Sequence, residues 1–406
     1  MMGCINKSSY LIACCSVLCL AACSADKVIN DGIDGNGEKN VKSVKFEVKT
    51  GWKNNESEKS RNISGENGIK DDLLLDAFIV KSVSSSDGGT EYTLLTDEED
   101  EWTGSESTGY TLSKNLEVGR YHFSMMMGVK RVATDEDGNS GKDCYIKTSD
   151  LPSTEMTDFC ILHPYSDNGL KECNALFLEE GTGEFSNEVN LSENSDGTAK
   201  HVFESKLTHA HARVDIMVIK ANKNSNGYYD IIDEDPLPYD GKISNISIEL
   251  ENLNNACSLK DLTFFKKDDI PDSYSGTFQN TEFSIFDYNE YINDFNGKNP
   301  FDGIESLEPL AKGNFQNIKL LKGLYFFPSS DNINLELTVN YKQNGTSGTP
   351  DSKVVTGQIT LNRNNVRLVV VWLINERFEV LPELDVTNEL PDYEGGVTSG
   401  DEGFWN

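Results

Sequence analysis

Basic residues are scarce in this 406-residue chain. The sequence has 36 Lys and Arg against 67 Asp and Glu, which gives a formal net charge of −31. An acidic surface repels phosphate backbones, so we expect no nucleic-acid partner. Catalytic signatures are also missing: the sequence has no Gly-x-Ser-x-Gly elbow, no phosphate-binding loop and no cysteine–histidine signature. With this many acids some carboxylates will lie together, but no pair stands out as glycosidase-like. We therefore expect a protein that is not an enzyme and has no cofactor.

Long apolar runs are missing except at residues 10–20, which are too few to span a bilayer as a mature helix. Lys7 is the only charged residue before Cys23, small residues precede that cysteine, and a polar stretch follows it. This order resembles a bacterial lipoprotein signal. It implies that residues 1–22 are removed and that Cys23 carries the lipid that anchors the chain to a membrane surface. The alternative is an ordinary signal peptide that contains a cysteine.

Cysteine is rare after this segment. Of nine cysteines, only four follow Cys23, and their spacing does not resemble a zinc site. Secretion permits disulfides, and four cysteines allow three complete pairings that the sequence cannot separate. Buried thiols are the alternative. The four residues are Cys144, Cys160, Cys173 and Cys257.

Long helical periodicity is nearly absent as well, whereas short strand patterns bounded by turn residues recur along the chain. A glycine-containing turn at 343–348 indicates an antiparallel hairpin between its flanking strands. This pattern predicts an all-β fold of β-sandwiches. The expected strands lie at 44–48, 73–80, 175–178, 212–219, 243–250, 323–327, 333–341, 353–361 and 367–373, and the unit 116–127 is expected to be a turn at Gly119 followed by a strand.

The domain organisation follows from these segments. Residues 23–61 form a polar tether that includes the first strand. We expect an N-terminal β-sandwich domain over 62–205 and a C-terminal one over 206–406, which includes a C-terminal tail.

Two groups of residues could hold a metal ion. His209 and His211 lie two apart in an expected strand, so both would face one side, but no third ligand can be named from the sequence. The acidic stretch 135–143 has oxygen ligands at alternate positions. Its glycine falls at the seventh place rather than the sixth, and no glutamate stands at the twelfth. We therefore predict no metal site.

Several motifs occur in a fixed order along the chain. They are the lipoprotein signal, the strand at 44–48, the loop arginine Arg61, the segment 118–123, the triplet His211-Ala212-Arg213, the pair Arg363-Asn364 and the aromatic terminus at 404–406. Together they span most of the mature chain. In this order they resemble the fimbrillin family, the FimA-type pilins of Bacteroidales type V pili.

The resemblance implies two tandem transthyretin-like β-sandwich domains and a role as a pilus subunit that supports adhesion. An arginine-specific protease would cut between Arg61 and Asn62. The strand that carries Val44, Phe46 and Val48 would then leave, and a segment of the next subunit would take its place.

The implied partners are other pilin subunits, the outer membrane through the lipid before processing, and a host or bacterial surface receptor. The implied location is the outer membrane for the precursor and then an extracellular fimbrium.

Two features fit this resemblance less well. The stretch 382–403 is more acidic and glycine-rich than the strand pair that a stalk subunit carries there, which leaves stalk, anchor and tip roles open. A surface glycan-binding lipoprotein is the alternative function, because Trp52, Trp102 and Trp405 lie in expected loops or tails and could form a binding groove. That alternative does not explain the order of strand, loop and arginine.

Overall fold

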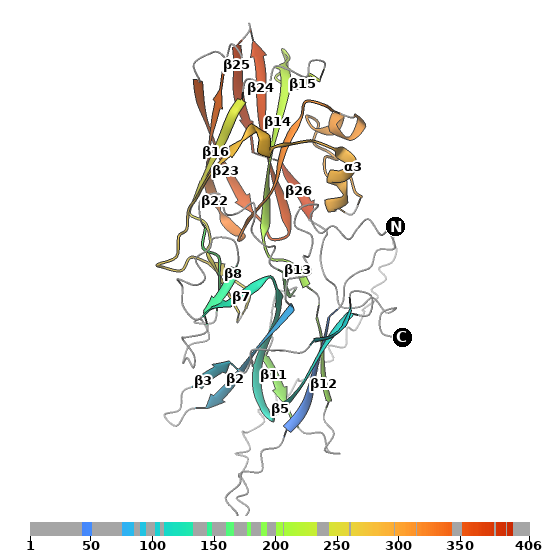
Figure 1. Cartoon of the computed structure of the whole chain (residues 1–406), viewed down its shortest axis with the longest axis vertical. Coiled ribbons are helices and arrows are strands. Elements are labelled where there is room, and N and C mark those ends of the chain that lie inside the picture. The colour runs from blue at the N-terminus through green and yellow to red at the C-terminus, as the bar shows by residue number, and fades with distance from the viewer. Residues whose placement is uncertain are drawn as a thin grey trace, which may run out of the picture. The chain divides into compact units, whose positions relative to one another are not determined.

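The computed structural model confirms the all-β class (Figure 1). It describes residues 43–50, 75–84, 90–94, 102–105, 109–132, 144–147, 160–165, 177–179, 188–192, 200–205, 207–233, 243–259, 261–295, 297–313, 315–342, 351–376, 379–386 and 388–392. Several residues singled out above lie outside these ranges, namely Cys23, Trp52, Arg61, Asn62, Cys173, Trp405 and the stretches 135–143 and 404–406.

Two sheets contain mainly strands from the first half of the chain, and each is named here by a strand within it. The β1 sheet has the order β12 (Lys200–Ser205), β1 (Ser43–Thr50), β5 (Gly109–Glu117) and β4 (Trp102–Ser105). The β6 sheet has the order β13 (Leu207–His209), β10 (Phe177–Glu179), β6 (Gly119–Met127), β2 (Leu75–Ser84) and β3 (Thr90–Leu94), with β11 (Glu188–Leu191) also paired to β6.

Two further sheets contain strands from the second half. The β14 sheet has the order β20 (Ser284–Ile285), β21 (Lys319–Phe326), β14 (Ala212–Lys223), β24 (Asn365–Glu376) and β25 (Glu379–Asp385). In addition, β15 (Tyr229–Ile231) pairs with β14 and β26 (Glu389–Asp392) pairs with β24. The β16 sheet has the order β19 (Tyr274–Gln279), β16 (Ile243–Glu251), β22 (Ser329–Tyr341) and β23 (Asp351–Leu361).

A fifth sheet, the β17 sheet, combines strands from both halves. Its order is β18 (Phe264–Phe265), β17 (Ala256–Ser258), β9 (Cys160–Leu162), β8 (Cys144–Lys147) and β7 (Val129–Val132). The backbone pairing of β17 with β9 therefore connects segments on either side of the expected boundary at 205/206. The division into two domains at that boundary stays a prediction.

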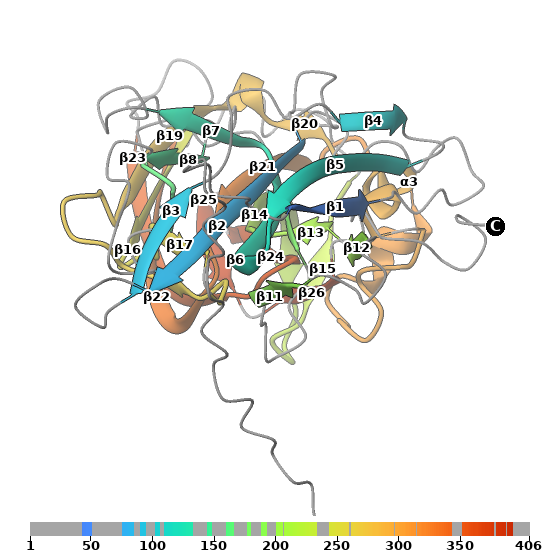
Figure 2. The same cartoon turned by 90° about the horizontal axis from the view of Figure 1, so that it is seen from below.

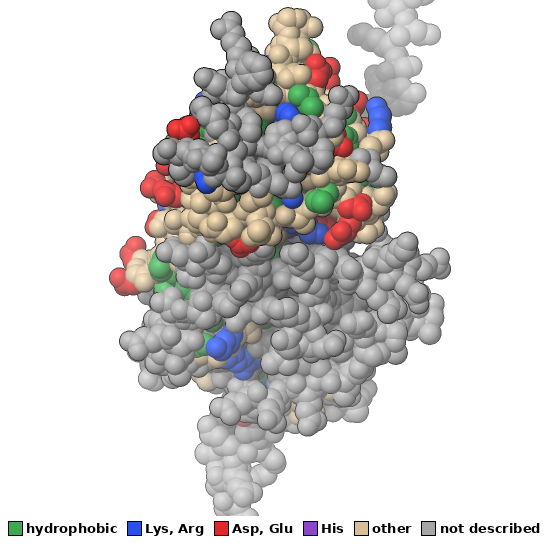
Figure 3. All heavy atoms as spheres, turned by 45° about the horizontal axis from the view of Figure 1, so that its top comes forward, with side chains coloured by type: hydrophobic (Ala, Val, Ile, Leu, Met, Phe, Trp, Pro, Cys, Tyr) green, Lys and Arg blue, Asp and Glu red, His purple; other side chains and the backbone are tan. Residues whose placement is uncertain are grey.

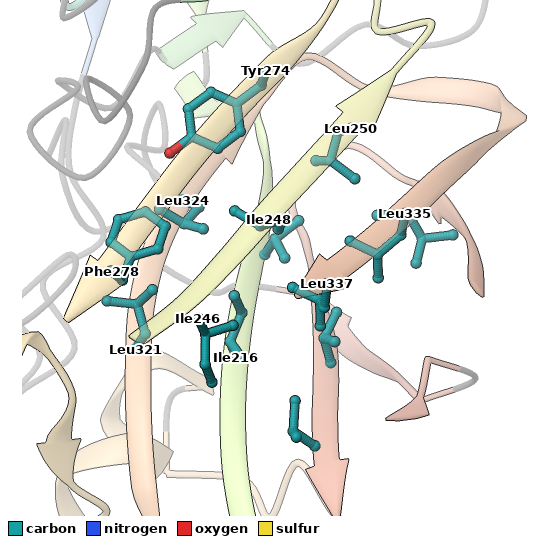
Figure 4. Packing of buried hydrophobic residues seen from close by; sticks show 14 of the residues in the cluster. Ile216, Ile246, Ile248, Leu250, Tyr274, Phe278, Leu321, Leu324, Leu335 and Leu337 are labelled. Carbon is teal, nitrogen blue, oxygen red and sulfur yellow. The ribbon is translucent and has the colours of Figure 1, made fainter. Parts of the chain in front are cut away.

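The β14 and β16 sheets form a sandwich around the largest described core. Figure 4 shows residues such as Ile216 on β14 and Ile248 on β16 within this cluster. β16 and β22 alternate buried and more exposed residues along much of their length, as strands with one solvent-exposed face do. The first ten residues of β14 are all buried. Only its middle, residues 216–219, is a continuous apolar run, because Arg213, Asp215 and Lys220 are buried along with the apolar residues.

The second face of β14 is covered by a short helical segment. Met217 and Ile219 pack in a separate cluster with Trp372 and with residues from the segment between β20 and β21. Each large side chain buried in this way contributes about 1.5–3 kcal/mol relative to exposure. The segment between β20 and β21 contains α3 (Tyr288–Tyr291), η4 (Ile292–Phe295) and η5 (Glu308–Lys312), and a further short helix, η3 (Asn280–Glu282), precedes β20.

The structure confirms the expected hairpin, corrects the expected position of Trp102 and shows strands within the acidic stretch 382–403. β22 and β23 pair antiparallel from Ile333↔Ile359 to Tyr341↔Asp351. Trp102, expected in a loop, is the first residue of β4. The stretch 382–403, which differs from a strand pair in composition, contains most of β25 and all of β26. Both strands pair with β24, and this backbone pairing holds them in the sheet despite their acidic sequence.

Candidate functional site

The first candidate site is the position of β1 inside its sheet. All eight residues of β1 pair antiparallel with β5, and six of them pair in parallel with β12 (Figure 2). β1 is therefore an internal strand with ladder partners on both edges. The structure thus confirms the strand expected at 44–48. The displacement of Val44, Phe46 and Val48 stays a prediction.

β5, the antiparallel neighbour of β1, has one apolar face. Leu112 and Leu116 are buried at 1% and 8% exposure, whereas Ser113 and Asn115 are exposed. In the ladder, Leu112 lies opposite Val48 and Leu116 lies opposite Val44. Without β1, β5 would present unpaired backbone groups beside these apolar side chains, which is the form of surface that accepts an added strand.

The second candidate site surrounds the triplet His211-Ala212-Arg213. Arg213 is 1% exposed, and its guanidinium donates to Asp215 and to Asp294, each at 2.8 Å. Lys322 forms a further ion pair with Asp294 at 3.2 Å. Two cations therefore balance two carboxylates in a buried network. This network joins β14 to the helical segment and to β21.

A β-bulge shapes this network. The pairing of β14 with β21 shifts register at Asp215, where Lys322 and Gly323 lie opposite a single residue. Gly323 has φ +95°, a conformation that residues other than glycine rarely adopt. Its N–H donates to Asp215 Oδ1 at 3.0 Å. The Tyr291 hydroxyl donates to Oδ2 at 2.8 Å. Burial and the charge of Asp215 raise the pKa of Tyr291.

The expectation that His209 and His211 share one strand is wrong. His209 ends β13 in the β6 sheet, whereas His211 lies in a bend before β14. The chain changes sheets between them, so the alternation that would place both on one face does not apply. Both histidines are buried, and burial lowers the pKa of each imidazole well below its usual value.

The pair Arg363-Asn364 contacts this bend. Arg363 Nε donates to the carbonyl of His209 at 3.2 Å, and the Asn364 N–H donates to the carbonyl of His211 at 2.9 Å. Asn364 has φ +62°, which an asparagine tolerates better than most residues. The turn before β24 therefore closes on the bend before β14. Two motifs far apart in the sequence form one structural unit.

Sequence reasoning missed His163, whose ring packs against the ring of His211. His163 follows β9, and its ring lies 5.1 Å from that of His211. Cys144 Sγ lies 3.6 Å from His211 Nε2. Burial lowers the pKa of His163 to about 3. No local signal marks His163, because only the pairing of β8 and β9 with the rest of the β17 sheet brings it to this place.

The described cysteines do not form disulfides with one another. Cys144, Cys160 and Cys257 are all buried in the β17 sheet. Burial raises the pKa of the Cys257 thiol, which disfavours its ionised, reactive form. Buried thiols are therefore the better interpretation for these three residues.

Comparison with known proteins gives only distant likenesses. No protein-family model matches the sequence, and no curated protein matches it. A proposed polysaccharide-binding protein from Bacteroides thetaiotaomicron is 13% identical, with 89% of this chain and 99% of that chain covered and a TM-score of 0.42. The fimbrial anchor protein Mfa2 from Porphyromonas gingivalis is 10% identical, with 86% and 99% covered and a TM-score of 0.36.

A third structure, a proposed cell adhesion protein from Bacteroides eggerthii, is 11% identical, with 89% of this chain and 95% of that chain covered and a TM-score of 0.33. Within the part of the chain that the structure describes, no helix is long and apolar enough to cross a bilayer.

Proposed function

We propose that this chain is a structural subunit of a fimbrium that supports cell adhesion. In this proposal a lipid on Cys23 anchors the precursor to the outer membrane, and cleavage between Arg61 and Asn62 frees the subunit to polymerise. The observation that carries the proposal is the internal position of β1 in its sheet, ahead of the polar loop that contains the cleavage site.

Unpaired strand edges would supply the driving force for assembly. Loss of β1 leaves β5 and β12 without the ladder partners that they share. An extended segment of a second subunit can restore these hydrogen bonds and cover the apolar face of β5. Each subunit then accepts a strand at one place and donates one from another. Such head-to-tail contacts do not close, and they therefore produce a fibre.

Electrostatics would oppose this assembly. Residues 23–61 contain eight Lys and Arg and seven Asp and Glu, a net charge of +1, so their loss makes the subunit slightly more acidic. Acidic side chains are distributed over the coloured part of the surface in Figure 3. Strand exchange, rather than attraction between charges, must drive the association. We expect added salt to speed polymerisation by screening the repulsion.

The first prediction concerns cleavage at Arg61. A purified chain that begins at Ser24 should lose its N-terminal segment on treatment with an arginine-specific protease and then form fibres. Arg61→Lys should remain uncut there and stay monomeric. Mass spectrometry gives the new N-terminus, expected at Asn62, and electron microscopy with light scattering follows the polymer.

Cleavage at other arginines could complicate this experiment. Arg120 and Arg131 lie in β6 and β7, where paired backbone resists proteolysis. A subunit that has lost residues 24–61 completely and still remains monomeric would contradict the proposal. Fibres formed by the uncut Arg61→Lys chain would contradict it equally.

A glycan-binding function receives less support from the described residues. The exposed large hydrophobic side chains among them are Tyr228, Ile285 and Val354, which belong to three separate segments, and only one is aromatic. Trp102 belongs to a strand of the β1 sheet rather than to a loop. Among the residues whose exposure the structure describes, Tyr228 alone is an exposed large aromatic residue, whereas a sugar-binding groove uses a row of exposed aromatic rings.

A further inference from the structure

Three buried side chains from distant parts of the sequence converge beside the bend before β14. Cys144 comes from β8, His163 from the segment after β9, and His211 from the bend itself. One ligand atom of each residue lies within 4.8 Å of the corresponding atoms of the other two. All three residues are at most 2% exposed. They form what we call the thiol–imidazole cluster.

The distance between Cys144 Sγ and His211 Nε2 in the thiol–imidazole cluster matches metal coordination. In a tetrahedral zinc site, bonds of about 2.3 Å to sulfur and about 2.0–2.1 Å to nitrogen place the sulfur and nitrogen ligands about 3.6 Å apart. Cys144 Sγ and His211 Nε2 are 3.6 Å apart. A hydrogen bond between a thiol and an imidazole gives the same separation, but it needs only two groups. The third residue, His163, gives the cluster the composition of a metal site.

Aromatic rings fix the orientation of both imidazoles. The Phe327 ring stacks on the His211 ring, with centroids 5.4 Å apart. It also packs edge-to-face with the His163 ring, with centroids 5.2 Å apart. The Tyr165 ring also packs against the His163 ring, with centroids 4.5 Å apart. Ligands that are held before the ion arrives lose little conformational freedom when it binds.

We propose that Cys144, His163 and His211 bind one thiophilic metal ion, with Zn²⁺ and Cu⁺ as the two chemical candidates. Binding forms one metal–sulfur bond and two metal–nitrogen bonds, and the thiol proton leaves to solvent. A thiolate with two imidazoles suits both ions. Cu⁺ with one thiolate gives an uncharged centre, whereas Zn²⁺ gives a centre of charge +1 in an apolar environment.

The location suggests what the ion would do. Cys144 and His163 precede residue 205, and His211 follows it, so the ion would join segments on either side of the expected domain boundary. A bound ion stabilises the folded state by mass action. This role goes beyond the proposed fimbrial function and does not depend on strand exchange. Sequence reasoning named no third ligand for His211, and the fold supplies two.

The test uses the chain that begins at Ser24, which lacks the five N-terminal cysteines. The protein is reduced, stripped with a chelator and titrated without oxygen, with Zn²⁺ in one arm and Cu⁺ in the other. We expect one equivalent of one of these ions to bind and to raise Tm by about 5 °C. Cobalt, used as a probe, should give a thiolate-to-metal charge-transfer band.

Variants assign the ligands. Cys144→Ala should abolish the charge-transfer band, and His163→Gln should weaken binding at least about tenfold. His209→Gln is the matched control, because His209 is equally buried and nearby but lies outside the cluster. X-ray absorption of the wild-type protein, which requires no variant to fold, should show one sulfur and two nitrogen ligands. Absence of stoichiometric binding, or a charge-transfer band that persists in Cys144→Ala, would overturn the proposal.

Discussion

A chain that begins at Asn62 is expected to be less stable than one that begins at Ser43 by on the order of 5 kcal/mol. The longer chain retains β1, whose eight residues pair with β5 and six of which also pair with β12. Each backbone hydrogen bond contributes about 0.5–1.5 kcal/mol net, so the loss of both ladders removes a large part of the 5–15 kcal/mol that stabilises a typical domain.

Urea unfolding of the two chains, at a protein concentration too low for the chain from Asn62 to polymerise, measures this difference. The chain from Ser43 is the matched control, because it retains β1 and differs from the chain from Asn62 only by residues 43–61. A synthetic peptide of residues 43–50, added to the chain from Asn62, should restore much of the lost stability, whereas a scrambled peptide should not. Equal midpoints for the chains from Ser43 and Asn62 would show that β1 is dispensable and would remove the physical basis for strand exchange.

The second large effect is expected at Arg213. Arg213→Met removes one of the two cations that balance Asp215 and Asp294, and leaves a buried negative charge without compensation. Breaking a buried ion pair by removing one partner costs about 3–5 kcal/mol. We expect the free energy of unfolding, measured by chemical denaturation, to fall by this amount. Methionine keeps an apolar side chain in place, so the loss reports mainly the charge.

The surface pair of Lys223 and Glu383 provides the control for this measurement. Its two charged atoms are only 2.6 Å apart, but the side chains are 35% and 37% exposed. Exposed pairs contribute about 0–1 kcal/mol because water and salt screen them. Lys223→Met should therefore change stability little. If Arg213→Met were equally mild, the buried network would have no structural role, and the triplet at 211–213 would need another explanation.

Much of the second half of the chain could be predicted from its sequence. β16, β22 and β23 bury one face each, so their alternation of apolar and polar residues is visible in the sequence. β14 and β24 bury both faces, and their apolar runs at 216–219 and 368–374 are equally clear in the sequence. In these strands the residue pattern reports burial directly.

The remaining features depend on contacts that a sequence pattern does not encode. β8, β9 and β17 have only three or four residues each, too few to show a period. The helical segment between β20 and β21 was not predicted, because its elements have at most five residues. Among the candidate sites, the motif marks Arg213 in the sequence, but its two buried ion pairs are visible only in the structure. Asp294 and His163 reach their partners only through the tertiary fold.

The most direct test of strand exchange is a reversible lock on β1. Glu47 of β1 lies opposite Ser113 of β5 in the antiparallel ladder, and a disulfide between Glu47→Cys and Ser113→Cys would hold the strand after cleavage at Arg61. The oxidised, cleaved double variant should stay monomeric. The same sample should form fibres once the disulfide is reduced, as should either single variant. Equal fibre growth in the oxidised and reduced samples would show that subunits join without vacating the place of β1.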